Sequence, residues 1–331
     1  MVKIVRFYKF GDADVLQLDE LPLSEPDKGE VRLKVEAIGL NRAEVMFRQG
    51  QYLEKPESFP ATLGYEASGV IDAIGEGVTE FQIGDRVSTI PGFSLKKYGV
   101  YGESAIVPVS AVAKYPEKLS PQEGTAIWVQ YMTAYGALIE YGQVKAGDFV
   151  LISAASSSVG FAAIQITKAA GAVAIATTRG VSKKQMLLDN GADYVIVTND
   201  EDLVTRVMEI TNGQGANLIF DPVAGSFLET LANAAAPGAT IFEYGALSPE
   251  ATTFPLFPAL QKGLKIQGYT VFEITSDPVK LERAKQYIYD GLDSDKLVPI
   301  LDRIFPLEQI AEAHRYMESN QQTGKIIVTV P

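Results

Sequence analysis

The chain has 331 residues, no cysteine and one histidine, His314. Without cysteine it cannot carry disulfides, iron–sulfur ligation or a thiol nucleophile, and one imidazole leaves few side chains of the kind that zinc prefers. The 29 basic and 41 acidic residues give a formal charge of −12, which argues against nucleic acid as a partner.

The length predicts two domains, at about 150 residues per domain. Acidic residues stand among the first fourteen, and no apolar run has the length of a membrane span. We therefore expect a soluble, cytoplasmic protein without a membrane partner.

Residues 1–125 predict a β-rich domain. Short runs such as Val31–Val35 and Ser68–Ile74 alternate apolar and polar residues between Gly and Pro breaks. This pattern is typical of half-buried antiparallel strands.

From residue 126 onward the pattern changes to α/β. Apolar runs separated by helical spacing predict a doubly wound parallel sheet over residues 126–275; the runs are Phe149–Ile152, Ala172–Ala176, Tyr194–Val197, Asn217–Phe220 and Thr240–Phe242. Residues 276–331 form a third segment, with helices near 279–289 and 307–318 and a strand at 326–330. We expect this segment to return to the first domain.

The strand at 149–153 leads into a turn of small residues, which are Ala154, Ala155, Ser156, Ser157, Ser158, Val159 and Gly160, and then into a helix. A strand, a tight turn and a helix N-terminus can bind a dinucleotide pyrophosphate. Only Gly160 remains of the three glycines of GxGxxG. Because any strand-to-helix turn in a parallel sheet favours small residues, a purely structural turn is the alternative.

The following strand end favours NADP(H) over NAD(H). NAD-binding units carry an acid about 20 residues after the turn, whereas Arg179 stands nineteen residues after Gly160. Residues 149–188 contain no acid, and Lys168, Arg179, Lys183 and Lys184 make them +4. Arg and Lys can donate to a 2′-phosphate, although the two lysines also suit a solvated helix start.

Seven ordered motifs resemble one known family. They are Gly39-Leu40-Asn41-Arg42, 64–70, 75–78 with 84–87, Met132-Thr133-Ala134-Tyr135, 154–160, Gly191-Ala192-Asp193 and 221–225. With them, the chain resembles the medium-chain dehydrogenase/reductase superfamily and, within it, the zinc-independent quinone oxidoreductase (ζ-crystallin-like) family. The resemblance implies a GroES-like catalytic domain, a Rossmann NADP-binding domain and a homodimer paired near residues 266–270.

Zinc relatives in this superfamily hold the metal through cysteine and histidine. Asn41 stands near the place of the first cysteine, and Tyr65 stands where the histidine of a Gly-His-Glu motif would be. The resemblance therefore implies no metal site.

The resemblance also implies the roles of individual residues. Asn41 and Tyr52 are expected to be catalytic. The substrate is expected to meet Met46, Tyr65, Trp128, Tyr131 and Tyr269, although Trp128 and Tyr131 also suit core packing. The cofactor is expected to meet Thr133, Ala155, Ser156, Ser157, Ser158, Val159, Gly160, Thr178, Arg179, Lys183, Tyr244, Gly245 and Lys325. Asp221 is expected at a strand end beside the cofactor, and His314 on the surface.

The expected function is NADPH-dependent hydride transfer to a quinone or an activated C=C bond, with the protein supplying position and electrostatics. Met46 stands where quinone reductases often carry a tyrosine, which implies a more apolar pocket. Two alternatives stay open, a metal-free carbonyl reductase or alcohol dehydrogenase and a catalytically idle nucleotide-binding protein.

Overall fold

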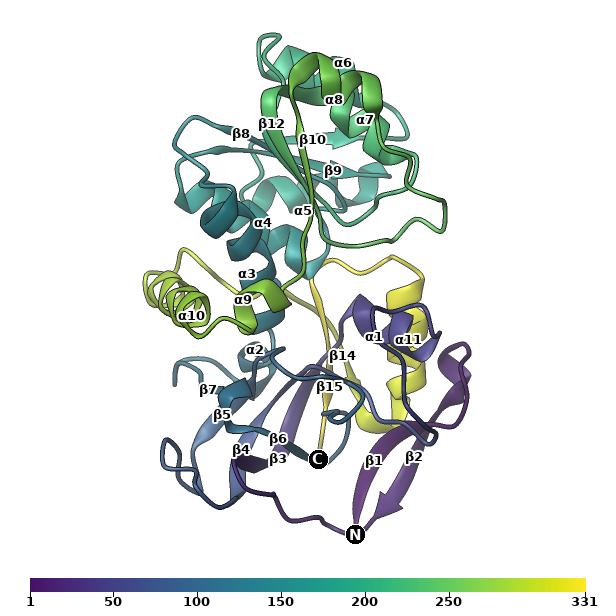
Figure 1. Cartoon of the computed structure of the whole chain (residues 1–331), viewed down its shortest axis with the longest axis vertical. Helices are drawn as coiled ribbons and strands as arrows, with labels where there is room; N and C mark the ends of the chain where they lie inside the picture. The colour runs from purple at the N-terminus through teal and green to yellow at the C-terminus, as the bar shows by residue number, and fades with distance from the viewer. The chain divides into compact units, whose positions relative to one another are not determined.

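The computed structural model describes all 331 residues, in two compact units. Unit 1 comprises Met1–Val129 with Pro299–Pro331, and unit 2 comprises Gln130–Val298 (Figure 1). The compact units have their borders at 129/130 and 298/299. The domain borders at 125/126 and 275/276 stay predictions from the sequence. None of the helices combines the length and apolarity needed to cross a membrane.

Unit 1 is rich in β-structure. A hairpin pairs β1 (Val2–Phe7) with β2 (Leu16–Leu21). The main sheet has the order β14-β15-β3-β4-β5-β7, and β6 also pairs with β3. Its strands are β3 (Glu30–Gly39), β4 (Glu66–Ile74), β5 (Arg86–Thr89), β6 (Ser104–Pro108), β7 (Val112–Lys114), β14 (Leu301–Pro306) and β15 (Lys325–Thr329).

The end of the chain completes this sheet, because β15 pairs antiparallel with β3. The helices of unit 1 are α1 (Arg42–Arg48), α2 (Pro121–Gly124) and α11 (Ile310–Glu318), and α3 (Trp128–Tyr135) begins at its border with unit 2. A capping box starts α1, in which the Glu44 carboxylate accepts the backbone N–H of Asn41.

Unit 2 is a parallel sheet of six strands in the order β10-β9-β8-β11-β12-β13. The strands are β8 (Phe149–Ile152), β9 (Val173–Thr178), β10 (Tyr194–Val197), β11 (Ala216–Asp221), β12 (Ala235–Glu243) and β13 (Lys265–Gly268). The strand order reverses between β8 and β11, and ligands of such sheets bind at this switch point.

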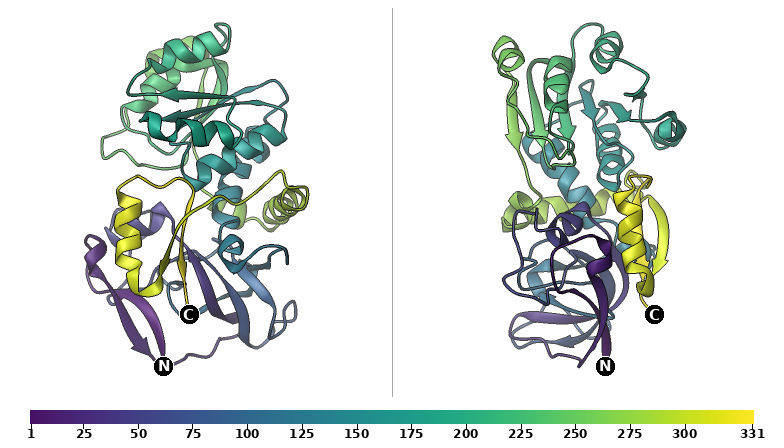
Figure 2. Two further views of the ribbon diagram at one scale, coloured as in Figure 1. Left: turned by 180° about the vertical axis from the view of Figure 1, so that it is seen from behind. Right: turned by 90° about the vertical axis from the view of Figure 1, so that its right-hand side faces the viewer.

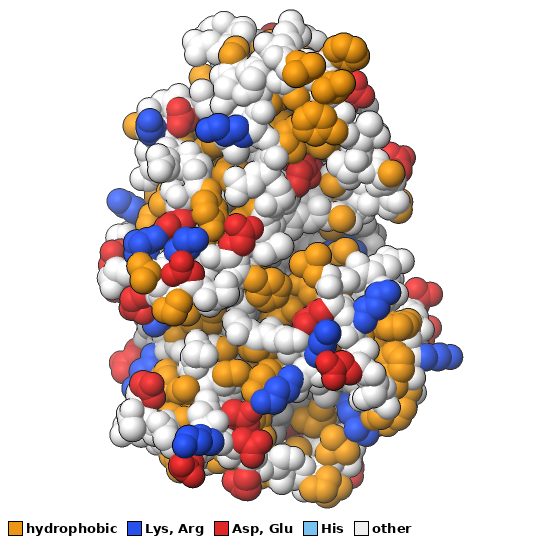
Figure 3. Space-filling view, in the orientation of Figure 1, with side chains coloured by type: hydrophobic (Ala, Val, Ile, Leu, Met, Phe, Trp, Pro, Cys, Tyr) orange, Lys and Arg blue, Asp and Glu red, His pale blue; other side chains and the backbone are white.

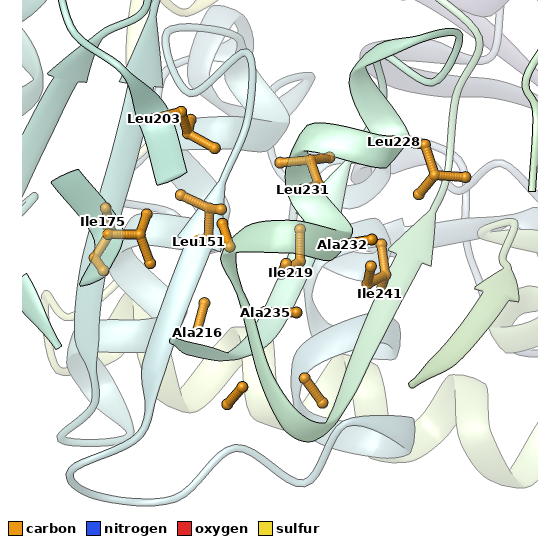
Figure 4. Close-up of a cluster of buried hydrophobic side chains, with 14 of the residues drawn as sticks. Leu151, Ile175, Leu203, Ala216, Ile219, Leu228, Leu231, Ala232, Ala235 and Ile241 are labelled. Carbon is orange, nitrogen blue, oxygen red and sulfur yellow. The ribbon is translucent and has the colours of Figure 1, made fainter. Parts of the chain in front are cut away.

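Most helices of unit 2 lie between successive strands of this sheet, the last two follow β13, and Figure 2 shows helices on both sides of the sheet. They are α4 (Ser158–Ala169), α5 (Lys184–Asp189), α6 (Leu203–Ile210), α7 (Phe227–Ala234), α8 (Leu256–Lys262), α9 (Phe272–Thr275) and α10 (Pro278–Asp293), with a π-helical segment at Gly136–Tyr141. Leu203 of α6 and Leu231 of α7 pack with Leu151, Ile219 and Ile241 of the sheet in one buried cluster (Figure 4).

One sequence expectation about unit 1 is wrong. His314 lies on α11 but is fully buried, with its ring edge-on to Tyr101 at 5.7 Å between centroids. The charged neighbours in the sequence indicated a surface helix, but the helix has an inward face as well, and His314 lies on it with Ala313 and Met317.

Candidate functional site

The predicted phosphate turn joins β8 to α4. Ser157 caps α4, since its side chain accepts the N–H of Gly160 at 3.0 Å. By their position in the first turn, the N–H groups of Ser158 and Val159 have no partner within the helix. Together with the helix dipole, these free N–H groups could hold an anion such as a phosphate group.

Gly160 allows the turn to lie directly on this helix. A Cβ atom at this position would stand 2.4 Å from the carbonyl oxygen of Ala155 and 2.6 Å from its Cα. The one glycine retained from the nucleotide motif is therefore required by the close contact between turn and helix.

Basic side chains lie at the carboxyl edge beside the turn. The Lys183 ammonium donates to the Ser156 hydroxyl at 3.3 Å, so a lysine 27 residues further along the chain reaches the turn. Arg179 follows the buried Thr178 at the end of β9 and is exposed. Arg179 and Lys183, the cationic residues expected to meet a 2′-phosphate, therefore both come shortly after the carboxyl end of β9.

The end of β12 also comes to this edge. The Tyr244 ring stacks on Phe220 at 4.0 Å between centroids and an interplanar angle of 16°. Its hydroxyl faces Ser157, and burial followed by the nearby Asp221 carboxylate raises the pKa of Tyr244. Gly245 follows, and a Cβ atom at this position would stand 2.9 Å from the carbonyl oxygen of Pro222.

Three other predicted residues of unit 2 are buried elsewhere in that unit. Thr133 lies on α3. The Tyr131 hydroxyl donates to Gln165 at 2.8 Å, and the Tyr269 hydroxyl donates to the carbonyl of Met132 at 3.2 Å. Both tyrosines are core residues whose hydroxyls bind other groups of unit 2, and their predicted contacts with substrate remain untested.

In unit 1, Asn41 lies in a buried ionic network. The Lys325 ammonium donates to Asn41 Oδ1 at 2.7 Å and forms an ion pair with Glu66. Lys325 is only 1% exposed and Glu66 is equally buried. Burying a lysine is costly unless a carboxylate pairs with it, so the ion pair with Glu66 accounts for the placement of Lys325.

Two carboxylates orient the Asn41 amide. Its Nδ2 donates to Glu66 and to Glu44, both at 3.2 Å. Glu44 also accepts the Tyr101 hydroxyl at 2.7 Å, and burial raises the pKa of Glu44. The amide is thereby held with Oδ1 toward Lys325.

Tyr52 and Tyr65 form a pair of phenols. Their rings meet edge to face at 6.4 Å between centroids, their hydroxyls hydrogen-bond, and the Tyr65 hydroxyl donates to Glu54 at 3.3 Å. Burial raises the pKa of Tyr52 to about 12 and that of Tyr65 higher still. Both phenols therefore stay protonated at neutral pH and can serve as donors.

The remaining predicted substrate residues lie on the helices of unit 1. Met46 is half-buried on α1. Trp128 is fully buried at the start of α3, and its indole N–H donates to Ser88 at 2.8 Å. Trp128 therefore has a clear packing role, as its alternative interpretation suggested.

The sequence did not single out Glu44, Glu66 or Glu243 as members of the site. Glu66 directly follows Tyr65 in the Gly-Tyr-Glu motif, and this place in the motif was the only sequence feature that could have indicated its role. In the structure, no group of three or more His, Cys, Asp or Glu side chains lies together in a way that could hold a metal ion.

Comparisons with known proteins agree with this architecture. Residues 27–117 match the alcohol dehydrogenase GroES-like domain, and residues 158–284 match the zinc-binding dehydrogenase domain. The quinone oxidoreductase of Homo sapiens is 32% identical over 332 residues, which cover 99% of this chain and 98% of that protein. The predicted GroES-like and Rossmann fold class is confirmed.

Solved structures show the same likeness. Escherichia coli quinone oxidoreductase complexed with NADPH is 27% identical with a TM-score of 0.90, and the match covers 99% of each chain. A structure described as an NAD-dependent alcohol dehydrogenase is 31% identical with a TM-score of 0.91, over 99% of this chain and 100% of that chain.

Proposed function

Because the chain belongs to the zinc-independent quinone oxidoreductase family of the medium-chain dehydrogenases/reductases, we propose that it is an NADP(H)-dependent oxidoreductase. Its substrate is a quinone or a compound with an activated C=C bond. The observation that carries the cofactor assignment is the acid-free segment 149–188, in which Lys183 reaches the phosphate turn.

The residues of unit 2 fit the cofactor. The N-terminus of α4 would hold the pyrophosphate, and Lys183 and Arg179 would hold the 2′-phosphate. NADPH supplies a hydride, and the protein supplies position and charge.

The residues of unit 1 fit a substrate that becomes an oxyanion. Hydride addition to a quinone or enone places negative charge on oxygen, which hydrogen-bond donors stabilise. Tyr52 would donate to this oxygen, with Tyr65 and Glu54 behind it. Lys325 positions Asn41 and adds a fixed positive charge to the buried network.

A carbonyl reductase or alcohol dehydrogenase activity is the second candidate, favoured by the 31% identical structure with that description. Initial rates of NADPH and NADH oxidation across quinones, enones and ketones separate the candidates. The proposal expects NADPH to be preferred and a saturated ketone to form from an enone. An allylic alcohol as product supports the second candidate, and no turnover with any acceptor indicates an idle nucleotide-binding protein.

The cofactor preference has its own test in a double variant, Arg179→Ala with Lys183→Ala. Because both cations would donate to the 2′-phosphate, the Kd for NADPH should rise on the order of tenfold or more, while the Kd for NADH changes little. The matched control is Lys145→Ala, an exposed lysine of the same unit. Equal weakening of both cofactors would contradict the assignment.

We also propose a homodimer formed through unit 2. The outer edge of β13 is unpaired in the sheet, and the adjacent α8 exposes Phe257 (80%) and Leu260 (71%), with Phe254 and Leu256 beside them. Figure 3 shows hydrophobic side chains gathered over this part of unit 2. An apolar patch next to a free strand edge is suited to pairing with a second copy.

A further inference from the structure

Two neighbouring strands of unit 2 end in carboxylic acids that lie side by side. Asp221 is the last residue of β11 and Glu243 the last residue of β12, and the two are direct register partners. Their side chains are within hydrogen-bonding reach of each other. The reaction outlined above gives this pair no role.

The pair is buried without a compensating cation. Asp221 is fully buried, and it accepts the Ser153 hydroxyl and the N–H of Ala224, the latter at 2.7 Å. Both carboxyl oxygens of Glu243 are buried and receive no N–H or hydroxyl hydrogen bond. No Lys, Arg or His forms an ion pair with either acid, and Tyr244 is the other titratable side chain facing them.

Two adjacent carboxyl groups in such surroundings cannot both be ionised, because like charges and desolvation oppose the second charge. Burial, and then the Asp221 carboxylate, raise the pKa of Glu243 to about 9. Burial also raises the pKa of Asp221. At neutral pH the pair therefore carries one negative charge and one shared proton.

The position of the pair connects it to the cofactor. Ser153, which donates to Asp221, directly precedes the phosphate turn, and Tyr244, which follows Glu243, faces Ser157 of the same turn. The two acids also lie on the β11 side of the switch point between β8 and β11, where ligands of such sheets bind.

We propose that the Asp221–Glu243 carboxyl pair is a part of the cofactor site that must hold its shared proton for the dinucleotide to bind, so that NADPH binding and protonation of the pair are linked. This inference rests on the proposed NADP(H) dependence. Loss of the proton would add a second negative charge beside a polyanionic ligand, and the ligand in turn favours the protonated pair.

The linkage has a definite sign. Above the pKa of the free pair, each NADPH bound takes up a proton, so the Kd rises as the pH rises. The limit for one linked proton is about tenfold per pH unit. The 2′-phosphate has a second pKa near 6 and is fully ionised throughout this alkaline range, so it adds no slope.

The test is titration of the protein with NADPH at pH 7, 8, 9 and 10, followed by nucleotide fluorescence. We expect the Kd to rise roughly threefold or more between pH 8 and pH 10. Calorimetry in buffers of different ionisation enthalpy should show proton uptake at pH 9 and almost none at pH 7. Binding at pH 7 tests the proposed cofactor, whereas the alkaline slope tests the linkage.

Glu243→Gln keeps the size of the side chain and removes the titration, so the rise in Kd above pH 8 and the proton uptake should both disappear. Glu229→Gln, an exposed acid on α7, is the matched control and should retain both. A slope that persists in Glu243→Gln overturns the proposal, since Lys183 or another group then causes it.

Infrared spectroscopy of the unmodified protein covers the case in which Glu243→Gln does not fold. The C=O band of a protonated carboxyl should be present at pH 7, should weaken by pH 10, and should persist at pH 10 when NADPH is bound. Absence of this band at pH 7 would show that the pair holds no proton, and the proposal would then be wrong.

Discussion

Among single residues, Tyr52 offers a half-buried phenol hydroxyl that can donate a hydrogen bond. With a pKa raised to about 12 it remains protonated at neutral pH. If it stabilises the developing oxyanion, Tyr52→Phe should lower kcat on the order of tenfold or more while the Kd for NADPH changes little.

The control for this prediction is Tyr8→Phe, which removes an exposed hydroxyl that donates to Asp19. Initial rates with one enone and one quinone provide the measurement. A Tyr52→Phe enzyme as fast as the unmodified protein would exclude this role for the phenol.

His314 makes the stability of the molecule depend on pH. Burial, followed by the charges of Arg48 and Arg42, lowers its pKa from 6.5 to about 3. The unfolded chain therefore binds more protons between these values, and stability is lost as the pH falls below 6.5. From pH 7 to pH 5 the loss is roughly 2 kcal/mol.

Urea unfolding at pH 7, 6 and 5 measures this loss. His314 is the only histidine of the chain, so His314→Gln should flatten the pH dependence over this range even if it lowers stability at every pH. If the pH dependence of stability is unchanged in His314→Gln, the loss of stability comes from carboxylates instead.

At the scale of elements, the contact between the phosphate turn and α4 depends on Gly160. The Cβ of Gly160→Ala would meet the Ala155 backbone at 2.4 Å, so the turn has to shift. Such overpacking costs about 1–3 kcal/mol. We expect lower thermal stability and weaker NADPH binding, measured by unfolding and by nucleotide fluorescence.

Gly180→Ala is the matched control, because it follows β9 at the same sheet edge and a Cβ there has open space. Its φ of −121° suits any residue. Equal effects of the two substitutions would contradict the steric explanation.

The elements themselves followed closely from local patterns. The apolar runs predicted at 149–152 and 194–197 are β8 and β10, and the helix predicted after the turn of small residues is α4 at 158–169. Periodicity and capping depend on neighbours in the chain, so they can be read without the fold. The second, fourth and fifth runs were predicted too short, because β9, β11 and β12 extend beyond their apolar residues.

At the scale of the whole molecule, the proposed dimer depends on the apolar face of α8. Phe257→Asp places a charge on this face, and we expect the protein to sediment as a monomer at micromolar concentration. Analytical ultracentrifugation measures this, with Val181→Asp, an exposed apolar residue elsewhere on unit 2, as control. A dimer that survives Phe257→Asp would place the interface elsewhere.

The sequence by itself determined the two kinds of architecture, the turn of small residues before α4 and the basic, acid-free segment 149–188, whereas the lack of zinc ligands at Asn41 and Tyr65 was implied by the family resemblance. Each of these depends on residues close together in the chain or on the type of residue at one position. Hydrophobic periodicity, a capped helix after a strand, and the lack of acids over residues 149–188 are all visible without knowing which segments meet.

Only the tertiary structure decided which distant residues become neighbours. Lys325 lies beside Asn41 across 284 residues, Asp221 pairs with Glu243 through strand register, and His314 is buried against Tyr101. The chemistry of a buried charge depends on its partners and on its exclusion from water. Neither can be inferred from the residues next to it in the sequence.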